Sequence, residues 1–79
     1  MQFTIHKYYK KTDGGFTILV QVDPDTFRGM EIMVGKEGIT KRKMVFDEFI
    51  EDDLQHDGFA ETGPLEFNLY LNGLVKWKY

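Results

Sequence analysis

The fold is decided by residues 3–22, which read FTIHKYYKKTDGGFTILVQV. Two runs rich in β-branched and aromatic residues flank Gly14-Gly15, where glycine adopts the positive φ of a tight turn at little cost. In the second run, every other residue from Phe16 to Val22 is apolar, as expected of a strand with one face in a core. We therefore predict strands over Phe3–Lys11 and Phe16–Val22, joined as an antiparallel hairpin.

Two further strands follow, each bounded by turn residues. Asp23-Pro24-Asp25 ends the second strand because proline cannot donate to a strand ladder, and Phe27–Gly29 is expected to be loop. The next strands are predicted over Met30–Val34 and Ile39–Val45, with a glycine-bounded turn between them. The middle of the last strand is the basic run Lys41-Arg42-Lys43, which favours an edge position because lysines discourage further pairing.

One amphipathic helix is predicted over about Glu48–Asp57. The carboxylate of Asp47 is expected to cap its N-terminus by accepting a backbone N–H. Gly58 is expected to end it in a Schellman motif, with Phe59 packing on a residue of the last turn, Leu54. Apolar residues at helical spacing predict one stripe that faces the core: Phe46, Phe49, Ile50 and Leu54.

Residues 64–79 allow two interpretations. The strict alternation of Leu65–Leu71 and the turn sequence Asn72-Gly73 favour a hairpin, with a return strand over Leu74–Tyr79. A direct two-residue register mixes the faces of this hairpin and would need a bulge to correct it. The alternative is a helix that begins at Pro64 and ends with Gly73 as its C′ glycine. We favour the hairpin.

These elements predict a single α+β domain over residues 1–79. The expected architecture is an antiparallel sheet of five to six strands in the order ββββαββ, with one amphipathic helix packed on one face. The chain has 79 residues and no cysteine, so neither disulfides nor thiolate-bound metals stabilise it. Its 42% hydrophobic and 15% aromatic content is that of a chain with a packed core, not a disordered one.

Charge is divided unevenly along the chain. Residues 47–66 contain eight acids and no lysine or arginine, so this segment carries −8, whereas the remainder carries +5 and the net charge is −3. The acidic part is the predicted helix with its exit loop, and the basic part is the predicted sheet. Asymmetry of this kind favours an interaction surface.

The first functional hypothesis is a non-catalytic protein-binding domain of the inhibitor, immunity or adaptor type. Complementary charge accelerates encounter with a partner and excludes wrong partners. The proposed contact is the acidic face of the helix, formed by Glu48, Glu51, Asp52 and Asp53. The simpler interpretation is a solvated helix face whose acids are favoured by the helix dipole. The sequence leaves open whether the chain forms a homodimer.

The alternative hypothesis is single-stranded nucleic-acid binding on an open sheet face. Lysine and arginine neutralise phosphates, and aromatic rings stack on unpaired bases. The candidate residues are Lys7, Tyr8, Lys10, Lys41, Arg42, Lys43, Lys76 and Lys78. The acidic net charge and the lack of a nucleic-acid recognition motif make this the less favoured hypothesis.

No catalytic or cofactor site is expected. The chain has no cysteine or serine nucleophile, and its two histidines, His6 and His56, fall in different predicted elements. Asp52, Asp53 and His56 share a helix face but provide too few ligands for a structural metal site. No run approaches the length of a membrane span or the apolar core of a signal peptide, so a cytoplasmic location is expected.

Overall fold

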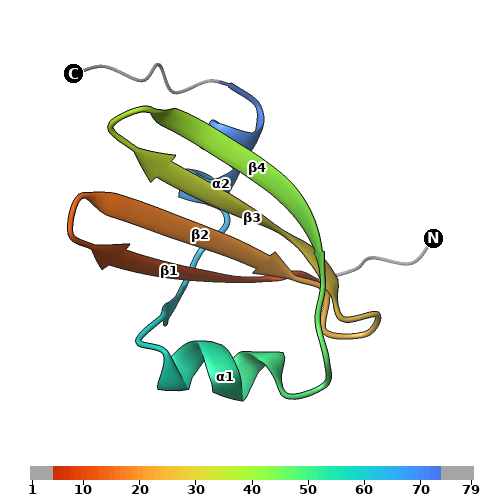
Figure 1. Ribbon diagram of the computed structural model, residues 1–79. Coiled ribbons are helices and arrows are strands. Elements are labelled where there is room, and N and C mark those ends of the chain that lie inside the picture. The colour runs from red at the N-terminus through yellow and green to blue at the C-terminus, as the bar shows by residue number, and fades with distance from the viewer. Residues whose placement is uncertain (1–4, 74–79) are drawn as a thin grey trace.

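The computed structural model describes residues 5–73, which form five strands and two helices (Figure 1). The strands are β1 (Lys7–Asp13), β2 (Phe16–Val22), β3 (Arg28–Gly35), β4 (Gly38–Val45) and β5 (Ala60–Thr62), and the helices are α1 (Ile50–His56) and α2 (Leu65–Leu71). All strands form one antiparallel sheet in the order β4-β3-β2-β1-β5. The predicted α+β class and the sheet of five strands are confirmed.

The β1–β2 hairpin has the predicted turn. Gly14 and Gly15 have φ values of 54° and 95°, and positive φ at both central residues gives a turn whose twist matches that of the flanking strands. All seven residues of β1 pair with all seven of β2. Within the described residues β1 begins at Lys7, and the predicted start at Phe3 lies outside them.

β3 begins at Arg28, two residues before the predicted start, because Asp23 closes the preceding loop tightly. The Asp23 carboxylate accepts hydrogen bonds from the backbone N–H groups of Asp25 at 2.9 Å and Thr26 at 3.3 Å. The N–H of Phe27 donates to the Asp23 carbonyl at 2.8 Å. Phe27 has a φ of 59°, a left-handed conformation that is uncommon for an aromatic residue. Of the predicted loop Phe27–Gly29, only Phe27 lies outside the strand.

α1 ends as predicted but begins later. The N–H of Phe59 donates to the Leu54 carbonyl at 2.9 Å, and the N–H of Gly58 donates to the Gln55 carbonyl at 3.1 Å. These two bonds, with a φ of 92° at Gly58, make the predicted Schellman motif. The Asp47 carboxylate accepts the N–H of Phe49 at 2.9 Å, but the helix begins only at Ile50.

The predicted hairpin over residues 65–79 is wrong in its first strand, since Leu65–Leu71 form α2. This is the helical alternative, with Gly73 at a φ of 69° and its N–H bonded to the Tyr70 carbonyl at 3.2 Å. Phe67 is fully buried, whereas Leu65 is 72% exposed, so the two side chains do not share one strand face. The predicted return strand Leu74–Tyr79 lies outside the described residues.

β5 was not predicted and takes the fifth place in the sheet. Its three residues pair antiparallel with β1, so that Ala60 lies opposite Lys10 and Thr62 lies opposite Tyr8. A three-residue strand carries too little alternation to be recognised in a sequence. It follows α1 directly and brings the chain across the edge of β1 toward the other face of the sheet.

The two helices pack on opposite faces of the sheet (Figure 1). On one face, α1 places Leu54 and Ile50 in a core that the sheet supplies with Tyr9, Val20 and Val22. On the other face, α2 places Phe67 against Leu19 and Ile32, with Tyr70 and Leu71 packed around them. The second helix was not part of the predicted architecture, and it covers the sheet face that was expected to be open.

Gly29 lies in β3 at a place where the neighbouring chain leaves no room for a side chain. A Cβ atom there would lie 1.7 Å from the backbone oxygen of Gln21 and 3.0 Å from the Phe46 ring. We expect Gly29→Ala to lower the free energy of unfolding by about 3 kcal/mol, the upper end for overpacked cores. Urea denaturation checks this, with Gly63→Ala as the matched control because nothing lies within 4 Å of its added Cβ. Equal stability of the two variants would contradict the strand packing.

Candidate functional site

The basic residues of the sheet are divided between its two faces. The register places Tyr9, Val20, Glu31 and Arg42 in one row across the strands, so Lys7 and Arg42 share the face covered by α1. Tyr8, Lys10, Lys41 and Lys43 lie on the face of α2, because neighbouring residues in a strand point to opposite sides. Lys76 and Lys78 lie outside the described residues. The residues of the nucleic-acid hypothesis are therefore not gathered on one face.

The face that carries Tyr8 is covered by α2. The Tyr8 ring lies 5.4 Å from the Phe67 ring between centroids, and its hydroxyl accepts a hydrogen bond from Gln21 at 3.1 Å. Lys10 pairs with Glu66 of α2 at 2.8 Å, and Lys41 donates to the Leu71 carbonyl at 3.0 Å. Tyr8 is therefore packed against α2 and partly buried, and two of the lysines are engaged within the fold.

Glu51, one of the four acids predicted to contact a partner, turns toward the sheet. Its Oε1 atom accepts a hydrogen bond from the Tyr9 hydroxyl at 2.6 Å and lies 3.1 Å from Lys7 Nζ. The bond from Tyr9 lowers the pKa of Glu51, and the hydrogen bond to Glu51 raises the pKa of Lys7. Burial raises the pKa of Tyr9 above its ordinary value, and the hydrogen bond to the Glu51 carboxylate raises it as well. Glu51 thus joins α1 to β1 and is not a free docking residue.

The other three predicted acids point outward. Glu48, Asp52 and Asp53 are exposed, and none makes an ion pair with the part of the chain that the structure describes. Asp52 and Asp53 lie in the first turn of α1, and Glu48 lies two residues before the helix. The acidic helix surface therefore remains, with three carboxylates instead of four.

An exposed aromatic ring lies among these acids. Phe49 is 60% exposed, which contradicts its predicted place in the core stripe. With about 3.6 residues per turn, Ile50 and Leu54 share one side of the helix. Phe49, just before the helix, is turned about 100° from Ile50 and neighbours the residues three, four and seven positions later. We call this set the α1 outer face: Phe49, Asp52, Asp53 and His56, with Glu48 beside it.

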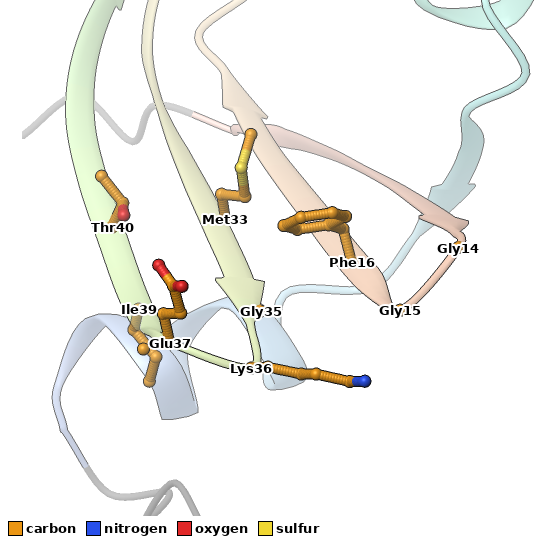
Figure 2. Close-up of a pocket in the computed structure, with 10 residues that line it drawn as sticks. Gly14, Gly15, Phe16, Met33, Gly35, Lys36, Glu37, Ile39 and Thr40 are labelled. Atoms are coloured by element: carbon orange, nitrogen blue, oxygen red, sulfur yellow. The ribbon is translucent and has the colours of Figure 1, made fainter.

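Two hollows lie near the ends of β4. The first, of about 660 Å³, is at the tips of both hairpins, and Figure 2 shows Phe16, Met33 and Thr40 side by side on neighbouring strands there. The second, of about 460 Å³, includes Met30, Lys43 and Val45 at the other end of the strand. The second hollow is also lined by His6, Asp23 and Thr26. The Asp23 carboxylate accepts the backbone N–H groups of Asp25 and Thr26, and within residues 5–73 no hydrogen bond joins His6 to Asp23 or Thr26, so these side chains are not linked as nucleophile, base and orienting group.

The described residues hold no cluster of three or more metal-ligating side chains, so Asp52, Asp53 and His56 form no such group there. Within residues 5–73, neither helix has the length and apolar character that crossing a bilayer requires.

The Tyr9–Glu51 bond gives a test of how α1 is held. We expect Tyr9→Phe to lower the free energy of unfolding by about 1.5 kcal/mol at pH 7, the range for hydrogen bonds to charged groups. Tyr70→Phe is the control, since the Tyr70 hydroxyl makes no hydrogen bond within residues 5–73. Urea denaturation of both variants measures the difference, and equal loss in both would rule out this role for Tyr9.

The same network predicts how stability depends on pH. Glu51 has a lowered pKa in the fold, so its contribution is complete above its ordinary value of 4.5 and is lost as the pH falls through its folded pKa. Tyr9 has a raised pKa, so its contribution is complete below 10.0 and is lost as the pH rises above that value. We expect Tyr9→Phe to flatten both limbs of the stability profile, measured by denaturation between pH 3 and 11 (about the accessible range). An unchanged profile would contradict the coupling.

The exposure of Phe49 is tested by comparing it with the buried side of the helix. We expect Phe49→Ala to change the free energy of unfolding by less than about 0.5 kcal/mol, as surface substitutions do. Leu54→Ala should lower it by about 2–5 kcal/mol, because Leu54 is buried. A large loss for Phe49→Ala in thermal or urea unfolding would place the ring in the core after all.

Comparison with known proteins assigns no family to this chain. It matches no protein-family model, no curated protein and no solved structure. The geometry of the chain itself is therefore the basis on which its function can be inferred.

Proposed function

We propose that this chain is a non-catalytic protein-binding domain whose contact with its partner is the α1 outer face. The observation that carries the proposal is Phe49, an aromatic ring that is 60% exposed between carboxylates without cationic partners in the described chain. The proposed setting is the cytoplasm, as expected from the sequence.

The position of Phe49 has no structural explanation in the described part of the fold. Ile50 and Leu54 already fill the space between α1 and the sheet. Burying a phenylalanine is favourable by about 1.5–3 kcal/mol, and this contribution is forgone while the ring stays in water. A partner with an apolar pocket would recover it, which is how aromatic residues act at the centre of protein interfaces.

The carboxylates around the ring specify the chemistry of that partner. Acids in the first turn are stabilised by the helix dipole, which explains part of their placement. The dipole does not explain an aromatic ring among them. Lysine and arginine around an apolar pocket would pair with Glu48, Asp52 and Asp53, and such complementary charge raises the rate of encounter. The proposed partner is therefore a protein with a basic rim around a hydrophobic pocket.

The test is differential capture with the purified chain as bait in a lysate of the source cells. We expect Phe49→Ala, and separately the double variant Asp52→Lys and Asp53→Lys, to lower recovery of one basic protein at least about tenfold, the loss that 1.4 kcal/mol produces. Phe16→Ala is the control for the ring, because Phe16 is 50% exposed at the far hairpins. Asp13→Lys with Glu37→Lys is the control for charge, because Asp13 is exposed at the end of β1 and Glu37 is exposed in the β3–β4 turn.

Quantitative mass spectrometry of the captured proteins separates the outcomes. Loss of a basic protein with the α1 variants but not with the controls supports the proposal. Recovery of the same proteins at the same levels by every variant would show that the α1 outer face is not the contact.

A further inference from the structure

β4 forms an open edge of the sheet. It is the last strand in the order β4-β3-β2-β1-β5, and among residues 5–73 it pairs with β3 alone. All eight of its residues pair with β3 in one unbroken register, with no bulge and no proline. Every second residue of an antiparallel edge strand directs its N–H and C=O groups outward. The outer side of β4 is therefore a continuous row of backbone donors and acceptors that no strand among residues 5–73 uses.

β4 is eight residues long, so it is not short enough for its length to prevent pairing with another strand. Natural sheets block edge pairing with short strands, bulges, prolines or charges. The opposite edge, β5, is only three residues long. β4 has the charges alone, and they are all positive and exposed: Lys41, Arg42 and Lys43.

This charge selects against a second copy of the chain. Two β4 strands paired antiparallel about a two-fold axis at Arg42 would place Arg42 opposite Arg42 of the second copy. Each Lys41 would then lie opposite a Lys43. Like charges directly opposite each other destabilise a strand pair, so the edge repels the homodimer that a bare edge strand would otherwise favour.

The positive charge is only partly balanced within the described fold. Arg42 pairs with Glu31 of β3 at 3.1 Å and remains 63% exposed. Lys41 is engaged by a neutral carbonyl, that of Leu71 at 3.0 Å. Lys43 makes no ion pair with any residue in the described range. A strand added beside β4 would meet Lys41 and Lys43 on one face and Arg42 on the other.

We propose that the β4 edge binds an extended acidic segment of a partner protein, which joins the sheet as a sixth strand. Backbone hydrogen bonds to β4 would supply the affinity, as in other complexes formed by strand addition. Acids on one face of the added strand would pair with Lys41 and Lys43 and provide specificity, whereas Arg42 on the other face already pairs with Glu31.

This surface is separate from the α1 outer face. α1 packs over Tyr9, Val20 and Val22 of β1 and β2, whereas β4 lies beyond β3 at the far side of the sheet (Figure 1). The charges of the two surfaces have opposite sign. The proposal therefore does not rest on the function of α1, and failure of one leaves the other intact.

The test uses the full chain labelled with ¹⁵N and a blocked peptide of four alternating glutamate-valine pairs. We expect saturable shifts at β4 amides, together with slower hydrogen exchange at the β4 N–H groups that are not bonded to β3. Lys43→Glu should weaken binding at least about fivefold, a loss of about 1 kcal/mol. Lys36→Glu is the matched control, because Lys36 is exposed in the β3–β4 turn.

Two further peptides and one variant complete the test. A peptide of alternating lysine and valine, and a glutamate-valine peptide with a central proline, should not slow exchange along β4. Phe49→Ala should bind the acidic peptide as the native chain does. The proposal is overturned if the acidic peptide gives no saturable shifts, if the shifts lie away from β4 or come without exchange protection, or if either further peptide protects β4 equally.

Discussion

β2 buries side chains on both of its faces, and the rest of the fold depends on this. Val20 and Val22 point to one side and Leu19 to the other, and each is at most 3% exposed. A sheet that is apolar on both faces cannot leave one of them in water. α1 covers the first side, and another element must cover the second. Residues 65–71 therefore form a helix that brings Phe67 onto Leu19, and this tertiary demand outweighs their strand-like alternation.

The uneven charge of the sequence becomes, in three dimensions, a set of links between the sheet and its helices. Lys7 pairs with Glu51 of α1, and Lys11 donates to the Asp57 carbonyl at the end of the same helix at 2.8 Å. Lys10 points to the other face and pairs with Glu66 of α2. These contacts explain why a basic strand and acidic helices occur in one chain. These pairs balance only part of the charge, and among the described residues the α1 outer face and β4 keep exposed charges of opposite sign without an ion pair.

Much of this fold follows from local patterns. The Gly14-Gly15 turn, the limits of β2 and the Schellman ending at Gly58 each depend on a few neighbouring residues, and all were predictable. β5 and α2 were not, because their placement depends on distant partners. For the candidate site, Glu48, Asp52 and Asp53 were predicted as an exposed acidic face, but Phe49 was assigned to the core. The predicted apolar stripe had four members, but Phe46, Ile50 and Leu54 alone pack against the core of the sheet. The sequence pattern does not show that the fourth, Phe49, is not needed there.

The two edge strands of the described sheet differ in length. β4 offers eight residues of backbone at one edge of the described sheet, whereas β5 offers only three at the other. The two edges therefore differ in how long a strand they can pair with. Pairing of one edge with the other edge of a second copy would engage at most the three residues of β5. The proposed strand addition at β4 would therefore have no equivalent at the other edge of the described sheet.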